Sequence, residues 1–249
     1  MSIELRDLHK AFGPKEILRG FTLQVQEGET LSIIGSSGAG KSVTLKHILG
    51  LIKPDEGEVR VDGKIVNELE GEELYELRRN VGYVFQFAAL FDSMTIGENV
   101  AMGLRRIRGI GEAEIRERVG DSLDRVDLHG VENLFPNELS GGMQKRAGLA
   151  RAIATQPKYL LYDEPTTGLD PSTVTIIDRL IMRMADELGA TGVIITHDME
   201  SAYKVSDRIA MLHEGRVRTV GTPEEIRSSE DPIVKGFIEG RPELLEKAS

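Results

Sequence analysis

The segment Gly35–Ser42 constrains the fold of this chain more than any other part of the sequence. It reads GSSGAGKS and fits the pattern G-x-x-x-x-G-K-[ST]. An apolar strand pattern at 31–34 precedes it, and a helical pattern that closes at Gly50 follows it. Glycines let successive backbone N–H groups curl around a phosphate, and the N-terminus of the following helix adds partial positive charge. The order of strand, loop and helix therefore predicts an α/β fold that holds a nucleoside triphosphate.

Two side chains at the end of this loop complete the predicted site. Lys41 is expected to reach the β and γ phosphate oxygens, and the Ser42 hydroxyl is expected to ligate Mg²⁺. The predicted nucleotide-binding residues of the loop are Gly35, Ser36, Ser37, Gly38, Ala39, Gly40, Lys41 and Ser42.

Strand and helix patterns alternate along much of the chain, which predicts a mostly parallel sheet. Apolar strand patterns occur at 159–162, 193–196 and 209–212, with helical patterns between them. The N-terminal portion differs, because it shows period-two alternation and the hairpin turn Asp62-Gly63. We therefore expect an antiparallel β subdomain there.

The predicted domain organisation is one α/β domain over residues 1–222. Residues from about 95 to 155 are expected to form an inserted helical lobe, because apolar residues such as Ile115 and Val119 recur on one helix face. Thr222 is suited to cap a helix, so residues 223–249 are expected to form a short C-terminal helical extension.

Two adjacent acids, Asp163 and Glu164, end the strand pattern at 159–162. The carboxyl end of a parallel strand lies at the ligand-facing edge of its sheet. There Asp163 could hold Mg²⁺ through water and Glu164 could polarise an attacking water. Two acids after a strand usually form a solvated turn, and the presence of Gly35–Ser42 favours the catalytic interpretation.

The sequence Ser140-Gly141-Gly142 opens a helical pattern just before that strand. Ser140 can cap the helix while the two glycines leave backbone N–H groups open, so the segment has the character of an anion-binding helix terminus. A plain N-cap is the alternative interpretation of this segment alone.

Charge and composition narrow the possible partners. The formal net charge is −10, which repels nucleic acid and anionic lipid head groups at long range. The chain has no cysteine, so it has no disulfide or thiolate metal site. The first ten residues are too charged for an export signal, and no apolar run reaches the 18 to 20 residues, roughly, that span a bilayer. We expect contact with a membrane only through a partner, and no binding to nucleic acid.

Taken together, these motifs resemble an ATP-binding cassette (ABC) transporter ATPase subunit in order and spacing, over residues 1–222. The motifs are GSSGAGKS, LSGGM, YLLYDEP, the triplets Gly168-Leu169-Asp170 and Thr196-His197-Asp198, and Gln86 in FQFAALF. The resemblance implies a P-loop fold, ATP hydrolysis with Mg²⁺, and a head-to-tail homodimer that holds ATP between its two copies. It also implies an integral membrane permease as partner, with the chain peripheral on the cytoplasmic face of the inner membrane.

The resemblance implies a role for each matching residue. Glu164 would be the general base, His197 the γ-phosphate switch, and Gln86 a sensor of Mg²⁺ and water. Phe12 would stack on adenine, and Asp170 would lie in the inter-subunit loop. The segment Ser140, Gly141 and Gly142 would contact the γ-phosphate across the dimer, and the metal site would comprise Ser42, Gln86 and Asp163. Two positions depart from the usual pattern: Met143 replaces a glutamine, and Phe12 replaces the commoner tyrosine.

Within the family, the stretch 85–95 is similar to the branch that moves lipid between bacterial membranes, of the maintenance-of-lipid-asymmetry and mammalian-cell-entry type. The alternative is the ATPase subunit of a polar-solute importer, for example of amino acids. Three phenylalanines within Phe85–Phe91 favour a groove for the permease, and core packing is the alternative.

Two other functions fit the sequence less well. Chromosomal ABC proteins insert long coiled coils between the nucleotide motifs, and ribosomal ones carry two cassettes, whereas this chain has one P-loop and no sustained heptads. A P-loop kinase would have no use for the LSGG motif or for Glu164 with His197.

Overall fold

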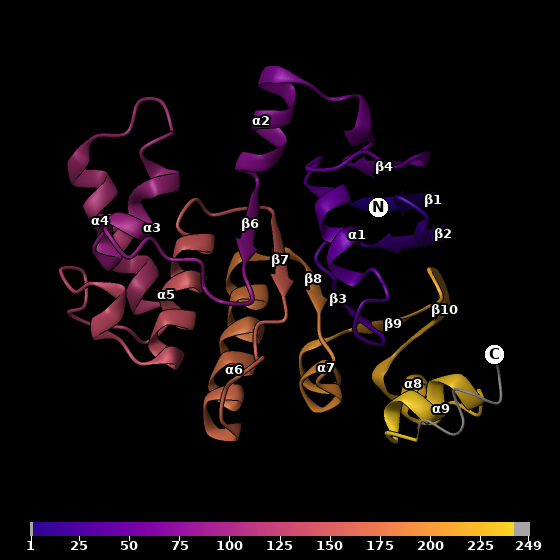
Figure 1. The fold of residues 1–249 in the computed structure, drawn as a ribbon. Helices are drawn as coiled ribbons and strands as arrows, with labels where there is room; N and C mark the ends of the chain where they lie inside the picture. Colours follow the sequence, from indigo (N-terminus) through magenta and orange to yellow (C-terminus); the bar gives the residue numbers. More distant parts are fainter. Residues whose placement is uncertain (1, 242–249) are drawn as a thin grey trace. The chain divides into compact units, whose positions relative to one another are not determined.

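Two compact units make up the computed structural model, which describes residues 2–241 (Figure 1). Unit 1 comprises Met1–Leu74 and Thr191–Ser249, and unit 2 comprises Tyr75–Ala190. The helix α2 (Gly71–Arg79) contains the boundary between them.

An antiparallel sheet occupies the N-terminal part of unit 1. Its strands, in the order β2-β1-β4-β5, are Lys15–Val25, Ile3–Phe12, Glu56–Val61 and Lys64–Ile65. Asp62 and Gly63 link β4 to β5 with positive φ angles of 50° and 78°, as the predicted hairpin turn requires. The predicted antiparallel subdomain is therefore confirmed.

Parallel strands form the second sheet of unit 1. The strand β3 (Thr30–Ile34) pairs in parallel with β8 (Thr191–Ile195) on one side and β9 (Arg208–His213) on the other. The strand β10 (Arg216–Gly221) adds to β9 in the antiparallel sense. β3 lies between two neighbours and is buried along its whole length, including its polar residues Thr30 and Ser32. The predicted α/β class with a mostly parallel sheet is confirmed.

Helices of unit 1 follow these strands. They are α1 (Lys41–Ile48), the 3₁₀ turn η1 (Val66–Glu68), α7 (Met199–Val205), α8 (Pro223–Arg227) and α9 (Pro232–Ile238). Thr222 forms the expected capping box with Glu225 at the start of α8. Ile226 of α8 and Val234 of α9 are buried in one cluster with Met211 of β9.

The structure does not test the predicted domain boundaries. The expected C-terminal extension contains α8 and α9, and its residues 242–249 lie outside the described residues. Every regular element described between residues 95 and 155 is an α-helix or a 3₁₀ turn, as expected for the inserted lobe. Unit 2, however, extends beyond that range on both sides.

Unit 2 combines one parallel strand pair with helices. The strand β6 (Val81–Val84) pairs with β7 (Tyr159–Asp163). The helices are α3 (Ile96–Leu104), α4 (Glu112–Asp124), α5 (Gly141–Ile153) and α6 (Pro171–Leu188), with a 3₁₀ turn η2 at Pro136–Glu138. Helices α3, α4 and α5 pack against one another (Figure 1).

The long helix α6 shows how local signals set an element's limits. Asp170 caps its N-terminus, Pro171 occupies its first turn, and Gly189 ends it with a left-handed φ of 58°. Its buried side chains Ile177 and Leu180 lie on the apolar face that the sequence pattern predicts. Among the helices of residues 2–241, none combines the length and the apolar character needed to cross a membrane.

Candidate functional site

The loop Gly35–Ser42 joins β3 to α1 in unit 1, as the sequence predicts. Gly35 and Gly40 have φ angles of 149° and 106°. A Cβ atom at Gly35 would lie 2.3 Å from the carbonyl oxygen of Leu212, and one at Gly40 would lie 2.7 Å from Cγ2 of Ile17. Only glycine fits at these two positions, since both backbone angle and space exclude a side chain.

The Lys41 side chain folds onto this loop. Its Nζ donates hydrogen bonds to the carbonyl oxygens of Gly35, at 2.8 Å, and Ser36, at 3.1 Å. Lys41 is 7% exposed, so its ammonium group lies inside the loop rather than in solvent. The loop thus presents an ammonium group together with the N-terminal amides of α1, which is the donor set that a polyphosphate requires.

His197 and Phe12, two further predicted site residues, also belong to unit 1. His197 is exposed and lies two residues after the end of β8, which is the parallel neighbour of β3. Both His197 and the P-loop therefore start at the carboxyl ends of adjacent strands, where ligands bind in open α/β sheets. Asp198 accepts hydrogen bonds from the Ser201 backbone N–H and hydroxyl, each at 3.2 Å, and so caps α7 directly after His197. Phe12 ends β1 and is 50% exposed, which leaves its ring available for stacking.

Asp163 and Glu164 lie in unit 2, at the carboxyl end of β7. The Glu164 backbone has a φ of 52°, in the left-handed region that non-glycine residues seldom occupy. Its Oε2 atom accepts a hydrogen bond from the Thr167 hydroxyl at 3.1 Å. Backbone strain of this kind persists where surrounding contacts impose it, and it is common at active sites.

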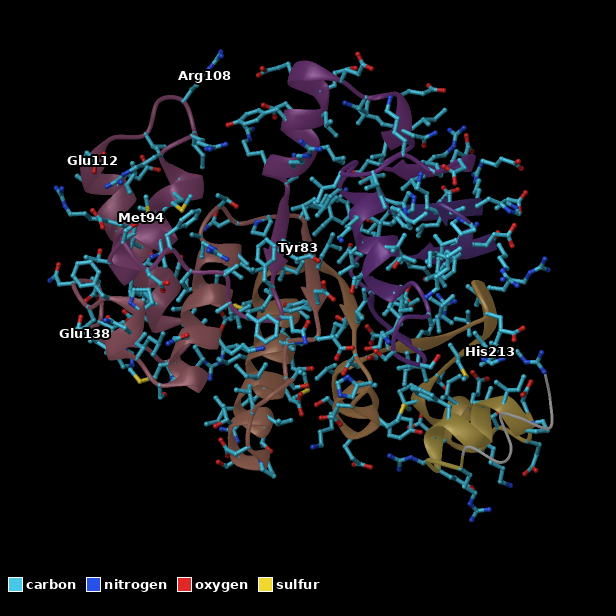
Figure 2. The ribbon with its side chains drawn as sticks, viewed as in Figure 1. Tyr83, Met94, Arg108, Glu112, Glu138 and His213 are labelled. Carbon is cyan, nitrogen blue, oxygen red and sulfur yellow. The ribbon has the colours of Figure 1, made fainter. Side chains whose placement is uncertain are left out.

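Tyr83 is a site residue that the sequence analysis did not identify. It lies on β6, beside β7 (Figure 2), and its hydroxyl donates a hydrogen bond to Oδ2 of Asp163 at 3.0 Å. Burial raises the pKa of Tyr83, and the Asp163 carboxylate raises it further, so the hydroxyl remains a donor at neutral pH. In the sequence, only the alternation of side chains along β6 points to this contact. That alternation is informative only when the register of β6 against β7 is known.

The segment Ser140–Gly142 begins α5 in unit 2. Ser140 Oγ accepts a hydrogen bond from the Met143 backbone N–H at 3.3 Å, which confirms the N-cap. This cap uses only the backbone of Met143, so the departure from glutamine there leaves it intact. A Cβ atom at Gly142 would lie 2.8 Å from Cγ2 of Thr173, so glycine permits a close approach to the start of α6.

Asp170 caps α6 next to this approach. Its carboxylate accepts hydrogen bonds from the backbone N–H groups of Ser172, at 3.0 Å, and Thr173, at 3.1 Å, and from both hydroxyls. Hydrogen bonds from the Ser172 and Thr173 side chains hold the pKa of Asp170 well below its usual range. Asp170 is therefore a fixed negative charge beside Gly142.

The docking segment, which we define as Phe85–Phe91, directly follows β6. Its Phe85, Phe87 and Phe91 side chains are 44%, 80% and 49% exposed, whereas Ala88 is only 3% exposed. Exposed aromatic side chains exclude the alternative that this segment is core. Gln86 lies within it, half-buried.

The predicted residues thus form two sets. Unit 1 holds Phe12, Gly35–Ser42 and His197, and unit 2 holds Gln86, Ser140–Gly142, Asp163, Glu164 and Asp170. Among residues 2–241 no cluster of three or more histidine, cysteine or acidic side chains could hold a metal. Magnesium that is bound beside a nucleotide needs no such cluster, because phosphate oxygens and water supply most of its ligands.

Comparison with known proteins identifies relatives of this arrangement. The family model described as "ABC transporter" matches residues 18–167. A probable ribonucleotide transport ATP-binding protein, mkl, of Mycobacterium leprae is 41% identical over 97% of this chain and 70% of its own length. The chloroplastic protein TRIGALACTOSYLDIACYLGLYCEROL 3 of Arabidopsis thaliana is 42% identical over 96% of this chain and 73% of its own length.

A second kind of transporter is also similar. The sulfate/thiosulfate import ATP-binding protein CysA of Synechocystis sp. is 39% identical over 96% of this chain and 66% of its own length. Among solved structures, a dimeric ATP-binding cassette in a post-hydrolysis state, MJ0796 bound to ADP and Pi, matches with a TM-score of 0.81. It is 37% identical and aligns with 89% of this chain and 98% of its own.

Proposed function

We propose that this chain, which belongs to the ABC transporter family, energises a membrane permease that moves lipid between bacterial membranes. The chain is an ATP-binding subunit and hydrolyses ATP. The observation that carries the ATP-binding part of the proposal is the P-loop geometry, in which glycine is required at Gly35 and Gly40 and the Lys41 ammonium lies inside the loop. The lipid cargo is supported by the stretch 85–95 and by the similarity to TRIGALACTOSYLDIACYLGLYCEROL 3.

Each predicted site residue has a role in the proposed hydrolysis. Gly35–Ser42 bind the phosphates, Phe12 stacks on adenine, and His197 contacts the γ-phosphate. Glu164 acts as the general base that polarises the attacking water. The strained Glu164 backbone and the hydrogen bond from Thr167 support this role, since both hold the carboxylate in one orientation.

Ser42, Gln86 and Asp163 would hold Mg²⁺, which, when bound, neutralises charge on the phosphate oxygens. The donors suit this ion, because a hydroxyl, an amide oxygen and a carboxylate oxygen are hard ligands. The hydrogen bond from Tyr83 fixes the orientation of the Asp163 carboxylate, as the partners of metal ligands commonly do.

Two copies of the chain form a head-to-tail dimer in this proposal. Ser140–Gly142 of one copy contact the ATP that is bound at Gly35–Ser42 of the other, with Asp170 in the loop between subunits. The N-cap at Ser140 and the exposed Gly141 support this role, because they leave backbone N–H groups open to an anion. The dimeric state of MJ0796 supports it as well.

The permease docks on the docking segment, and the chain is thereby peripheral on the cytoplasmic face of the inner membrane. The exposure of Phe87 and Phe91 supports this, since aromatic side chains are common hot spots of protein interfaces. A polar-solute importer is the second candidate, and the similarity to CysA favours it.

Purification of the full chain from membranes tests the cargo. We expect an integral membrane protein to co-purify, together with bound phospholipid that mass spectrometry identifies. The reconstituted complex should move lipid between vesicles only with ATP, and the same complex with Lys41→Ala should not. ATPase stimulation by a polar solute, without lipid movement, would instead establish the importer.

The substitution Glu164→Gln tests the catalytic roles and the dimer. Hydrolysis should slow by roughly 10² to 10⁴, the usual contribution of a positioned general base. Because ATP then stays bound, light scattering should find a dimer in ATP and a monomer in ADP. A monomer under both conditions would contradict the proposed dimer, and unchanged hydrolysis would remove Glu164 as the base.

A further inference from the structure

One face of α5 is built to hold the docking segment. Lys145, Gly148 and Arg151 recur at intervals of three residues, which places them on the same side of the helix. Each approaches the backbone of the docking segment. This face is separate from the Ser140–Gly142 terminus of α5, which the proposed function uses.

Lys145 binds the backbone of Gln86. Its Nζ donates a hydrogen bond to the Gln86 carbonyl oxygen, and the side chain is only 7% exposed. Burial lowers the pKa of Lys145, and the negative charge of Glu164 raises it, so the ammonium lies within electrostatic reach of that carboxylate. One buried cation therefore binds the Gln86 backbone and is influenced by the charge of Glu164.

Arg151 binds the next part of the same segment. Its Nη1 and Nη2 atoms donate hydrogen bonds to the carbonyl oxygens of Ala89, at 2.5 Å, and Ala88, at 2.7 Å. The guanidinium carbon also lies 5.7 Å from the centre of the Phe85 ring. Arginine suits this task because its planar group presents several donors in fixed directions.

The segment that these cations hold has an unfavourable backbone. Ala88 and Ala89 have φ angles of 58° and 50°, a left-handed conformation that is unfavourable for a non-glycine residue. A Cβ atom at Gly148 would lie 3.2 Å from the Ala88 Cα, so glycine there allows the segment to approach α5. Contacts from α5 must therefore impose this conformation, because the local sequence does not favour it.

We propose that Lys145 is a positioning residue for ATP hydrolysis, which holds the Gln86 backbone at α5, with Arg151 holding the adjoining Ala88-Ala89 turn. This inference rests on the proposed roles of Gln86 and Glu164.

The neighbouring residue Arg146 provides a control that distinguishes this role from simple stabilisation of the fold. Arg146 donates from Nη1 to the carbonyl oxygens of Val126, at 3.2 Å, and Asp127, at 2.6 Å. It is thus another α5 cation that binds backbone carbonyl oxygens, but its partners lie outside the docking segment. If cations of α5 only stabilise the fold, the loss of Lys145 and of Arg146 should have the same consequence.

Steady-state ATPase kinetics and thermal melting of the full-length chain test the proposal with Lys145→Met, Lys145→Arg and Arg146→Met. Lys145→Met should lower kcat by roughly ten- to a hundredfold, the scale of a misplaced catalytic group. The KM for ATP should change less than about threefold, because Gly35–Ser42 are untouched. Lys145→Arg should restore most of kcat, and Arg146→Met should keep kcat within about threefold even if its melting temperature falls.

Equal losses of kcat in Lys145→Met and Arg146→Met would overturn the proposal, as would a raised KM with unchanged kcat. If Lys145→Met does not fold, Arg151→Lys is measured instead, because it keeps the charge but replaces a two-donor contact with one ammonium group. Its kcat should fall severalfold at a nearly unchanged melting temperature, and unchanged kcat would overturn the proposal. Glu164→Gln in parallel reports separately on the proposed function, since its effect does not depend on Lys145.

Discussion

The P-loop Gly35–Ser42 and the docking segment Phe85–Phe91 follow parallel strands and are of similar length, but they obtain their conformations differently. The P-loop places glycine at each of its left-handed positions. The docking segment places Ala88 and Ala89 there, and side chains of α5 hold them. One loop is therefore encoded by its own residues, whereas the other depends on a helix about 60 residues away in the sequence.

The largest effect is expected from Gly40→Ala, which places a side chain in the P-loop Gly35–Ser42. The added Cβ would lie 2.7 Å from Ile17 Cγ2, so overpacking of about 1 to 3 kcal/mol adds to left-handed strain of about 1 to 2 kcal/mol. ATP titration calorimetry should show a loss of binding, and urea unfolding a loss of about 2 to 5 kcal/mol.

Gly38→Ala is the matched control for this change. Gly38 has a φ of 77°, but a Cβ atom added there would have no heavy atom within 4 Å, so only backbone strain applies. We expect a loss of stability of about 1 to 2 kcal/mol. Equal losses of stability in the two variants would mean that steric crowding around Gly40 does not explain the need for glycine there.

The next largest effect is expected from Phe87→Ala, on assembly rather than on folding. Phe87 is 80% exposed, so its truncation should leave the melting temperature of the free chain nearly unchanged. Binding to the permease in a pull-down should weaken by about 2 kcal/mol or more, the size of an interface hot spot.

The fully buried Phe21 of β2 provides the contrast to Phe87. Phe21→Ala should destabilise the chain by about 3 to 5 kcal/mol, because it leaves a cavity in the core. A large loss of stability in Phe87→Ala with an intact pull-down would show that the docking segment serves the fold alone.

A smaller effect, an increase in the free energy of unfolding rather than a decrease, is expected from Ala89→Gly. Glycine removes left-handed strain of about 1 to 2 kcal/mol, while the freer unfolded chain offsets about 0.4 to 1 kcal/mol of this gain. The free energy of unfolding should therefore rise by up to about 1 kcal/mol. Ala185→Gly, in the last turn of α6, should instead lower it by up to about 1 kcal/mol. A loss in both variants would show that Ala89 is not strained.

The smallest effect is expected at His47. The helix α1, which follows the P-loop, and the helix α5, which holds the docking segment, each bury a basic side chain. Lys145 of α5 has the Gln86 carbonyl as partner, whereas His47 of α1 binds only through Nδ1, to the Val43 carbonyl at 2.8 Å. Within residues 2–241, the buried His47 Nε2 atom has no hydrogen-bond partner. Burial lowers the pKa of His47 below its ordinary value of 6.5, although the Val43 hydrogen bond opposes this.

The sign of the pH dependence follows from this shift. Below about pH 6.5 the unfolded chain takes up a proton at His47 before the folded chain does, so acid favours unfolding. The free energy of unfolding should be level above that pH and should decrease as the pH falls further. Urea unfolding from about pH 7.5 to about pH 5 should show a flatter profile for His47→Met than for the unchanged chain. An unaltered slope in His47→Met would contradict the assignment.

Much of the fold was predictable because its signals are local. Asp62-Gly63 marked a hairpin, and Gly35–Ser42 implied the strand before it and the helix after it. The short strand β10 and the helix α7 were not predicted. Their apolar residues are few, and their stability comes from packing on β9 and β3 respectively.

Sequence alone determined the identity of the P-loop and the position of Asp163 and Glu164 at a strand end, because backbone angles and strand ends depend on adjacent residues. Tertiary structure decided the contact of Tyr83 with Asp163, 80 positions apart, and of Lys145 with Gln86, 59 positions apart. It also decided that the docking segment is exposed. Contacts of this kind depend on strand register and helix packing, which bring together residues that no local pattern relates.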